Sequence, residues 1–332
     1  MRATTHVLAS GGVVAARTGV ADDEWDAALQ AIDGHFLQST AWQRVQRALG
    51  YPVLTERGDG WMWAASVRTG VFPRYMYTPY GPAATEHLDD ALRSAAAAGR
   101  THRVDFVRVE PASARARFAL DHMHARPTDD IQPRWTWLLD LDVAEGQLRA
   151  GLSAGHRGSI NAAPRKGIEI RVTRQPGDMD VFIALQRRAA SQGAFSGRPA
   201  EYHRTAARVL MPTGAACLYV AEVNGRPIAA AVAFDFGRTR YYAHAVSDRE
   251  GRRLSAAAPL VWSMIVDARS AGKQSFDFWG VRPDAPPGHP WSGFTQFKMA
   301  FGGRLVERGG TWDVPLRALR YSLYARLRRI RR

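Results

Sequence analysis

Apolar and polar positions along the chain follow two periods that predict alternating helices and strands. Apolar residues repeating every three to four positions indicate helices, and short alternating or continuous apolar runs between turn residues indicate strands. Helices are expected at 23–33, 36–50, 87–98, 144–166, 178–193 and 254–271, with a short helix carrying Lys298 and a terminal helix. Strands are expected in WMWAASVR, YMYTPY, VDFVRVEP, WTWLLDLD, IEIRV, CLYVAEV, PIAAAVAFDF, TRYYAHAVS and SFDFWG, and around RLVERGGTWDV.

The order of these elements predicts one structural plan used twice. Asn224 and Gly225 separate two apolar runs and predict a β-hairpin, and a chain of 332 residues suits two domains of about 150 residues each. Strand–helix alternation with hairpins predicts an α/β (α+β) fold of two acetyltransferase-like (GNAT) domains with mixed sheets. We expect domains at 1–143 and 144–313, a terminal helix 314–332 joined to the first domain, and no coiled-coil arm, because no heptad run is present.

Composition narrows the class of protein. No apolar run approaches the roughly 20 residues of a membrane-spanning helix, and we interpret the N-terminal stretch as the start of the fold, not as a secretory signal. Cys217, the only cysteine, lies in the run AACLYVAEV and is expected to be a buried strand residue. His and acidic residues show no metal-binding spacing, so we expect a cytoplasmic protein without a metal site.

The positive charge is concentrated in the second half of the chain. Residues 1–150 carry 16 arginines and 18 acidic residues, a net charge of −2, whereas residues 151–332 carry 29 basic and 13 acidic residues, a net charge of +16. This asymmetry favours a polyanionic partner, nucleic acid or an anionic membrane surface. A general bias of the proteome toward basic residues is the alternative.

Lysine is rare in this chain. Lys166, Lys273 and Lys298 are the only lysines among 45 basic residues. A compact ammonium on a flexible stem reaches into a closed site where a forked guanidinium does not fit in the same way. Lys298 is therefore a candidate for chemistry; the alternative is an exposed helix residue that escaped the drift toward arginine.

A basic turn between a predicted strand and helix, residues 252–257, has the layout of an acyl-CoA acetyltransferase core. In that core the turn reads Arg/Gln-x-x-Gly-x-Gly/Ala, and its glycine lets backbone N–H groups at the helix N-terminus hold the CoA pyrophosphate. Ser255 stands where glycine is expected. The sequence thus indicates either weak CoA binding or another acyl donor.

Further segments resemble, in order, those of the Fem family of aminoacyl-tRNA-dependent peptidyltransferases. The resemblance to the short FemX-like type covers about residues 35 to 332 and rests on FLQSTAWQRVQ, YTPYGPA, IQPRWTWLLDLDVAEGQLRAGLSAGHRGSINAAPRKGIEIRV, GRPAEYH, YYAHAVS, SFDFWG, GFTQFKMAFGG and GTWDVPL. It implies a cytoplasmic enzyme that moves an amino acid from aminoacyl-tRNA onto an amine of a UDP-linked or lipid-linked peptidoglycan stem-peptide precursor. Aminoacyl-tRNA would be a co-substrate, with no further cofactor, and we expect a monomer.

The resemblance also implies roles for individual residues. Phe297 and Lys298 fall on the family's Phe-Lys pair at the acyl-transfer centre. Arg198 and Tyr202 fall on an Arg-x-x-x-Tyr pair that holds the precursor, and Tyr242 falls on the first Tyr of a Tyr-x-Tyr strand.

Three positions depart from the family pattern. His244 replaces the second Tyr of that strand, Glu110 replaces an Asp before Pro, and Gln46 replaces a Lys four residues after Trp42, with Arg47 beside it. We keep His244, Glu110 and Arg47 as candidate substrate-binding residues. The departures bear on how the phosphates of the precursor are held.

The residue types support this chemistry without a nucleophilic side chain, because an aminoacyl ester is already activated. A cation aimed at the developing oxyanion is the main requirement, and removing such a donor typically costs roughly 10²–10³ in rate.

Arg198 and Tyr202, four residues apart, form either a phosphate clamp or a surface stack. Tyr242 is either a substrate contact or an inward aromatic. His244, on the same face at period 2, is either a proton relay or a core histidine.

The loop and strand near Lys298 supply further candidates. Asp277 and Trp279 alternate on SFDFWG and are expected to line the same cleft. His289 and Trp291 lie in a predicted loop able to cover it.

The terminal segment LRALRYSLYARLRRIRR predicts a basic amphipathic helix. Its apolar stripe is flanked by seven arginines and no acid. We expect the stripe to pack on the first domain and to leave RRIRR for polyanions; contact with the inner face of an anionic membrane is the alternative.

The sequence leaves three rival functions open. These are a tRNA-dependent amide-forming enzyme of natural-product biosynthesis, an acyl-CoA N-acyltransferase, and a non-catalytic protein that binds RNA or membrane.

Overall fold

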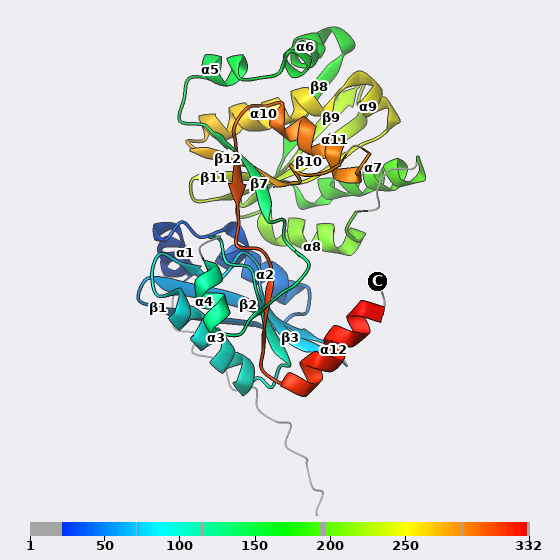
Figure 1. Cartoon of the computed structure of the whole chain (residues 1–332). Helices are drawn as coiled ribbons and strands as arrows, with labels where there is room; N and C mark the ends of the chain where they lie inside the picture. The colour runs from blue at the N-terminus through cyan, green and yellow to red at the C-terminus, as the bar shows by residue number, and fades with distance from the viewer. Residues whose placement is uncertain (1–21, 71, 114–115, 193–196, 287, 331–332) are drawn as a thin grey trace, which may run out of the picture.

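The computed structural model describes residues 22–330 except 71, 114–115, 193–196 and 287. Two domains lie one above the other in Figure 1, each built on a mixed seven-stranded sheet. The described helices are α1 (Asp22–Ala31), α2 (Thr40–Ala48), α3 (Leu88–Thr101), α4 (Arg117–His122), α5 (Glu145–Ala150), α6 (Ala154–Ala162), α7 (Met179–Ser191), α8 (Ala200–Leu210), α9 (Arg249–Leu254), α10 (Ala257–Ser270), α11 (Pro290–Met299) and α12 (Ala318–Ile330), with short 3₁₀ turns η1 (Phe36–Gln38), η3 (Pro164–Lys166) and η4 (Pro176–Asp178).

The two sheets share one pairing plan. The first has the order β1-β2-β3-β5-β14-β6 with β4 beside β2, and the second has the order β13-β7-β12-β11-β10-β9-β8. Each contains a single parallel pair, β3 with β5 and β11 with β12, among antiparallel neighbours. The strands are β1 (Val53–Gly58), β2 (Trp61–Thr69), β3 (Arg74–Thr78), β4 (Ala83–Ala84), β5 (Phe106–Val109), β6 (Arg126–Pro127), β7 (Trp135–Asp140), β8 (Ile168–Thr173), β9 (Ala216–Val223), β10 (Arg226–Phe236), β11 (Thr239–Ser247), β12 (Ser275–Val281), β13 (Arg304–Glu307) and β14 (Trp312–Pro315).

The sheets confirm the predicted fold of two acetyltransferase-like units with mixed sheets, and they adjust the expected boundaries. Strand β7 pairs with β12 and β13 in the second sheet, so the chain enters the second domain before Trp135 and not after residue 143. Strand β14 returns to the first sheet beside β5, close to the expected boundary at 313. The longest described helices, α3 and α10, have 14 residues each, and no described helix pair projects as a coiled-coil arm.

Several local predictions are confirmed and two are wrong. The hairpin at Asn224 and Gly225 forms, with both residues at positive φ, and Cys217 is buried in β9. The single helix expected over 144–166 is instead α5, α6 and η3, and the helix expected over 254–271 begins at Ala257 after a left-handed Ser255. No described helix is both long and apolar enough to cross a membrane.

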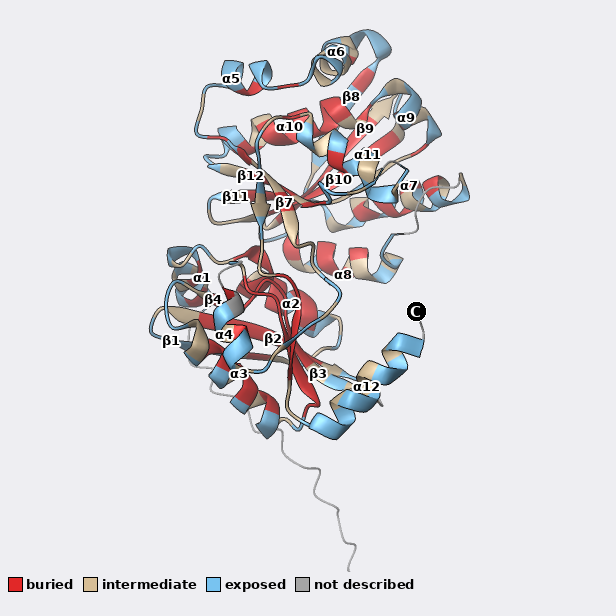
Figure 2. Cartoon of the chain, viewed as in Figure 1, coloured by how far each residue is buried: buried red, intermediate tan, exposed pale blue. Residues whose placement is uncertain are grey.

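The two domains share an apolar core. Phe36 of the first domain stacks on Phe234 of the second at 4.8 Å between ring centroids, and α2 packs against α8. Figure 2 shows buried residues continuing from the first sheet through α2 and α8 into the second domain. Because burial of apolar area is the main stabilising contribution, the domains are expected to behave as one rigid body.

Helix α12 packs on the first domain through polar and aromatic side chains. Arg108 forms a two-point ion pair with Asp313 (2.6 and 2.8 Å) and donates to the Tyr324 hydroxyl (3.0 Å). Tyr321 donates to Asp313 at 3.2 Å, and Phe106 lies against both tyrosines. The predicted stripe makes this contact only through Leu316, which lies before α12 and packs on the first-domain core. The prediction is wrong for Leu319, Leu323, Leu327 and Ile330, because α12 meets the domain with its other face.

Removing the charge of Asp313 should therefore be costly. Asp313→Asn leaves the guanidinium of Arg108 buried without its counter-charge, and we expect a loss of about 3 kcal/mol in the free energy of unfolding. The measurement is urea denaturation followed by circular dichroism. The matched control is Asp90→Asn, which breaks the exposed pair with Arg93 (2.7 Å) and should change stability by about 0.5 kcal/mol or less. Equal effects of the two substitutions would contradict the role of the buried pair.

Candidate active site

The second sheet opens where its one parallel pair ends. Strands β11 and β12 are paired from Thr239 with Ser275 to Tyr241 with Asp277 and no further, although both strands continue. Two irregularities accompany this separation: the β10–β11 register shifts at Ala243, and the β12–β7 register shifts between Asp277 and Gly280. In the first sheet, by contrast, β3 and β5 stay paired to the end of β3. The opening therefore distinguishes the second domain from the first.

Lys298 reaches into this region from α11. Its ammonium donates to the carbonyl oxygen of Gly280 at 2.6 Å and lies 6.0 Å from the centroid of the Tyr242 ring. Burial lowers the pKa of Lys298 to about 8, and the carboxylate of Asp277 opposes this shift. The side chain is half-buried, so the alternative of an ordinary exposed lysine is not what the structure shows.

Phe297 is placed differently from its neighbour. Its ring packs on Phe301 (5.4 Å) and on His156 (4.9 Å), and its carbonyl oxygen lies 3.1 Å from the ring nitrogen of His156. Phe297 thus fixes α11 against α6. Its contacts support the helix that carries Lys298.

A second group lies on the opposite face of β11. The Tyr202 hydroxyl is 3.3 Å from Nε2 of His244, and the ring of His203 is 5.0 Å from that of His244. Exposed Arg198 lies with its guanidinium 5.4 Å from the Tyr202 ring. The structure therefore brings Arg198, Tyr202 and His244 together.

The expectation that His244 shares a face with Tyr242 is wrong. The bulge at Ala243 inserts one residue between them, and each extra residue reverses the side on which the next side chain lies. Tyr242 accordingly packs near Phe278, whereas His244 packs near Phe234.

Burial keeps the histidines of this group neutral. Desolvation, followed by His203 and Arg198, lowers the pKa of His244 to about 3. Desolvation also lowers the pKa of His203 to about 4 and raises the pKa of Tyr202 to about 12. At neutral pH, His244 is a neutral hydrogen-bonding partner of the Tyr202 hydroxyl, and Arg198 supplies the positive charge.

Asp277 and Trp279 belong to the interface between domains. The Asp277 carboxylate is buried; it accepts hydrogen bonds from the Thr136 hydroxyl and the Trp279 amide (2.7 Å) and pairs with Arg308 (3.2 Å). Trp279, at a φ of 63°, lies within 5.3 Å of the His35 ring. The sequence reasoning missed Thr136, Arg308 and His35, and no motif marks them. Asp277 therefore braces the bulge that presents the carbonyl of Gly280 to Lys298.

Glu110 and Arg47 lie apart from the Lys298 group. Buried Glu110 accepts hydrogen bonds from the Tyr77 hydroxyl (2.6 Å), the Thr311 hydroxyl (2.6 Å) and the Gln132 amide (2.8 Å). It thereby ties together the two segments that connect the domains. Arg47 is exposed on α2, where it donates to Gln43 of the same helix at 3.5 Å.

The expected covering loop is in fact partly helical. His289 accepts the Trp291 amide at 3.1 Å and caps α11, which begins at Pro290. Trp291 is thus a residue of the first turn of α11, and it lies beside Gly280.

The turn that resembles a CoA-binding segment has serine in a backbone conformation that glycine adopts more readily. Ser255 has a φ of 58°, a conformation that favours glycine. Pro259 lies in the first turn of α10 and supplies no N–H. The ammonium of Lys166 donates to the Leu254 carbonyl oxygen at 2.9 Å. Because of Pro259, the first turn of α10 has one backbone N–H fewer for a pyrophosphate.

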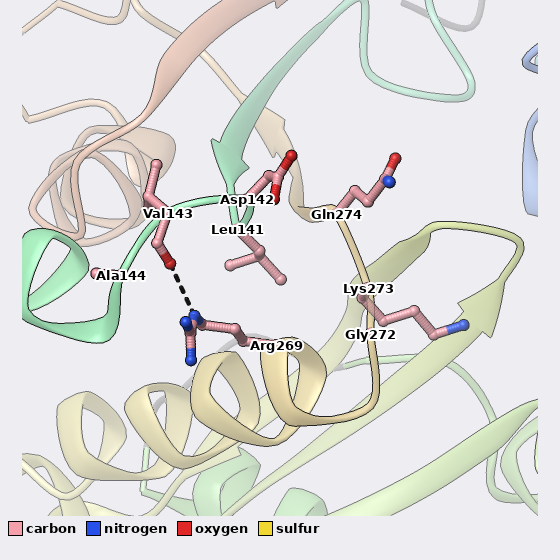
Figure 3. A pocket seen from close by; sticks show the side chains of 8 residues that line it. All are labelled: Leu141, Asp142, Val143, Ala144, Arg269, Gly272, Lys273 and Gln274. Carbon is pink, nitrogen blue, oxygen red and sulfur yellow. Dashed lines mark hydrogen bonds between the residues drawn. The ribbon is translucent and has the colours of Figure 1, made fainter.

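A shallow hollow of about 530 Å³ lies elsewhere on the second domain (Figure 3). Its two basic side chains are engaged with backbone: Arg269 donates to the Val143 carbonyl oxygen and Lys273 to that of Gly237, each at 2.8 Å. None of the candidate residues lines it. Its lining residues are Leu141, Asp142, Val143, Ala144, Arg269, Gly272, Lys273 and Gln274.

The two sheets together form a tandem GNAT-like fold. Residues 153–293 match the family model described as "Acetyltransferase (GNAT) domain". A search of curated protein sequences found no match.

Among solved structures, the chain is similar to FemX over 92% of its length and 98% of that chain, with a TM-score of 0.82 and 17% identity. It is also similar to the C-terminal domain of a putative lysylphosphatidylglycerol synthetase from Agrobacterium fabrum (TM-score 0.61, 16% identity, 91% and 97% covered). A tandem GNAT protein from the clavulanic acid biosynthesis pathway is a third (TM-score 0.55, 14% identity, 90% and 97% covered). The predicted resemblance to FemX-like Fem proteins is thus confirmed at the level of the fold.

The environment of Lys298 makes a prediction for its titration. In protein with isotope-labelled lysine, NMR should show one side-chain resonance that titrates at about pH 8, because the buried ammonium is less stable than in water. That resonance should be missing from Lys298→Met. A Lys298 signal that titrates at the ordinary lysine value would contradict the buried position of its ammonium.

Proposed function

We propose that this protein transfers an amino acid from aminoacyl-tRNA onto an amine of a peptidoglycan precursor stem peptide. The observation that carries the proposal is the half-buried ammonium of Lys298 held by the Gly280 carbonyl at the point where β11 and β12 separate. The match to an acetyltransferase domain and the FemX-like fold support the broader class of acyl or aminoacyl transferases. The choice of donor and acceptor belongs to our proposal.

The proposed reaction is aminolysis of an ester. The acceptor amine attacks the ester carbonyl, the C–N bond forms, and negative charge develops on the carbonyl oxygen. The ammonium of Lys298, still largely protonated at neutral pH, stabilises that charge. As the C–O bond to the tRNA ribose breaks, the ribose oxygen takes a proton and the amine loses one. Tyr242, 6.0 Å from the ammonium, forms one wall of this space.

The acceptor side of the proposal rests on Arg198, Tyr202 and His244. Arg198 is exposed and charged, which suits a phosphate of a UDP-linked or lipid-linked precursor. Neutral His244 orients the Tyr202 hydroxyl toward a second hydrogen bond with the same ligand. The two groups lie on opposite faces of β11, so the acceptor would reach past the separated strand ends. Glu110 and Arg47 are not part of this proposed site.

Two features favour aminoacyl-tRNA over acyl-CoA as the donor. Residues 151–316, which leave out α12, carry a net charge of +9, which suits a nucleic acid, and the CoA-type turn lacks its glycine and one N–H. Calorimetry with CoA tests the rival: tight binding would favour an acyl-CoA N-acyltransferase. A non-peptidoglycan acceptor, as in natural-product biosynthesis, would appear as transfer to other amines only.

We propose that the protein acts as a monomer in the cytoplasm.

Substitution of Lys298 should test the catalytic role. The protein is incubated with a pool of charged tRNAs and a stem-pentapeptide precursor, and the mass shift of the product is followed. We expect Lys298→Ala and Lys298→Arg both to lower kcat by roughly 10²–10³, since a planar, forked guanidinium would place its charge differently from the compact ammonium. Lys273→Ala is the matched control and should retain activity.

The pH profile gives a second readout of the same role. The ammonium is lost as pH rises through about 8, so the advantage of the wild-type protein over Lys298→Ala should shrink above that pH. Full activity of Lys298→Arg, or a constant ratio across this range, would remove Lys298 from the mechanism. Absence of transfer with every amino acid would remove the proposed function itself.

Substitution of Arg198 should affect binding of the acceptor and not the chemical step. Arg198→Ala removes the proposed phosphate contact, and we expect KM for a phosphate-bearing precursor to rise about tenfold or more with kcat nearly unchanged. Arg208→Ala, at another exposed arginine near the end of α8, is the control. If KM rises equally for a stem peptide that lacks phosphate, the contact is not to phosphate.

A further inference from the structure

Helix α12 presents an apolar stripe to solvent. Its inner face is anchored to the first domain by Tyr321, Tyr324 and Arg328, the last of which pairs with Asp129 at 2.8 Å. With 3.6 residues per turn, positions 319, 323, 327 and 330 lie on the other side of the helix. The fractional exposures there are 89% for Leu319, 52% for Leu323, 41% for Leu327 and 80% for Ile330.

The exposed stripe is not a consequence of a loosely attached helix. Arg320 pairs with buried Asp105 at 2.5 Å, and its guanidinium lies 5.2 Å from the Phe72 ring. Together with the tyrosine contacts, this pair fixes the rotation of α12 about its axis. Figure 2 shows the outer side of α12 as exposed along the helix, and Figure 1 shows its C-terminal end directed toward the second domain.

The charged residues of α12 itself are all basic, and two of them, Arg320 and Arg328, are paired with Asp105 and Asp129. Arg326 and Arg329 flank the leucines and are exposed, and residues 314–332 contain seven arginines and no acidic residue. A surface that combines an apolar stripe with unopposed arginines complements a bilayer with anionic headgroups, which offers apolar depth and negative phosphates together.

We propose that α12 docks in the plane of an anionic lipid bilayer, with Leu319, Leu323, Leu327 and Ile330 inserted below the headgroups. Arg326 and Arg329 would lie at the level of the lipid phosphates. This inference goes beyond the proposed function and does not depend on it. A helix of 13 residues, about 20 Å long at 1.5 Å per residue, is long enough to lie in the interface but too short to span it.

Two other occupants fit the surface less well. A second copy of the chain in a symmetric contact would place α12 against α12 and bring arginines together without an acid between them. A nucleic acid would contact the arginines but would leave the four apolar side chains uncovered.

The test is flotation of the full-length protein with vesicles, without tRNA or precursor. The wild-type protein should bind phosphatidylglycerol vesicles at least about tenfold more tightly than phosphatidylcholine vesicles, because each arginine near the surface contributes about fivefold. Leu319→Ser/Leu323→Ser should weaken binding to the anionic vesicles by about tenfold or more. Arg326→Gln/Arg329→Gln should weaken it and reduce its salt dependence.

Matched controls separate the stripe from general surface properties. Phe118→Ser removes a comparably exposed apolar residue (79%) from α4, and Arg93→Gln/Arg100→Gln removes two exposed arginines from α3; both should bind like the wild type. Circular dichroism and the melting temperature should be unchanged in every variant, since the altered side chains are exposed.

Three outcomes would overturn the docking proposal. In the first, the leucine double variant binds anionic vesicles as well as the wild type. In the second, sedimentation shows a wild-type dimer that the leucine variant dissociates, which would make the stripe a contact between copies. In the third, the leucine variant loses binding to tRNA but not to vesicles. Loss of transfer activity alone would concern the proposed function and not this surface.

Discussion

The buried carboxylate of Asp277 holds the arrangement on which the rest of the structure depends. It lies at the last paired position of β11 and β12 and accepts hydrogen bonds from Thr136 of β7 and from the Trp279 amide. Its ion pair with Arg308 reaches the segment that returns to the first domain. One side chain thus connects the strand bulge, the neighbouring strand and the domain junction. Together with the pairing of Gly280 and Thr136 in the β12–β7 ladder, it places the Gly280 carbonyl beside Lys298.

The junction between domains and the candidate site are therefore built as one unit. The guanidinium of Arg308 lies 5.1 Å from the Tyr80 ring of the first domain, and Trp279 packs on His35. Burial, followed by the charge of Arg308, holds the pKa of His35 well below its usual range, so this contact is a neutral aromatic one. Movement of one domain against the other would break these aromatic contacts and the buried ion pair, and both losses are destabilising. Such movement would therefore also disturb the strand opening.

The duplicated plan does not make the domains equivalent. Strand β14 follows the strands of the second sheet but pairs with β5 and β6 of the first. Only the second parallel pair separates before its strands end. The return of β14 ties the domains together, and the separation confines the proposed chemistry to one of them.

Sequence patterns by themselves determined the succession of helices and strands, the repeated mixed-sheet plan and the hairpin at Asn224 and Gly225. They also singled out Lys298 as one of three lysines in an arginine-rich chain. These depend on local periodicity, turn residues and residue rarity, all of which can be read along the chain. Only the tertiary structure decided that His244 faces away from Tyr242, because a bulge of one residue reverses a face without leaving a mark in the sequence. The same holds for Glu110, whose hydrogen bonds come from residues far apart in the chain. Helix α12 is the clearest case. Its apolar stripe predicted an inward apolar face, but the helix instead turns its arginine and tyrosine face inward, where it binds Asp105, Arg108 and Asp313. Amphipathicity gives a helix two different faces. Which face turns inward depends on the residues of the surface against which the helix packs.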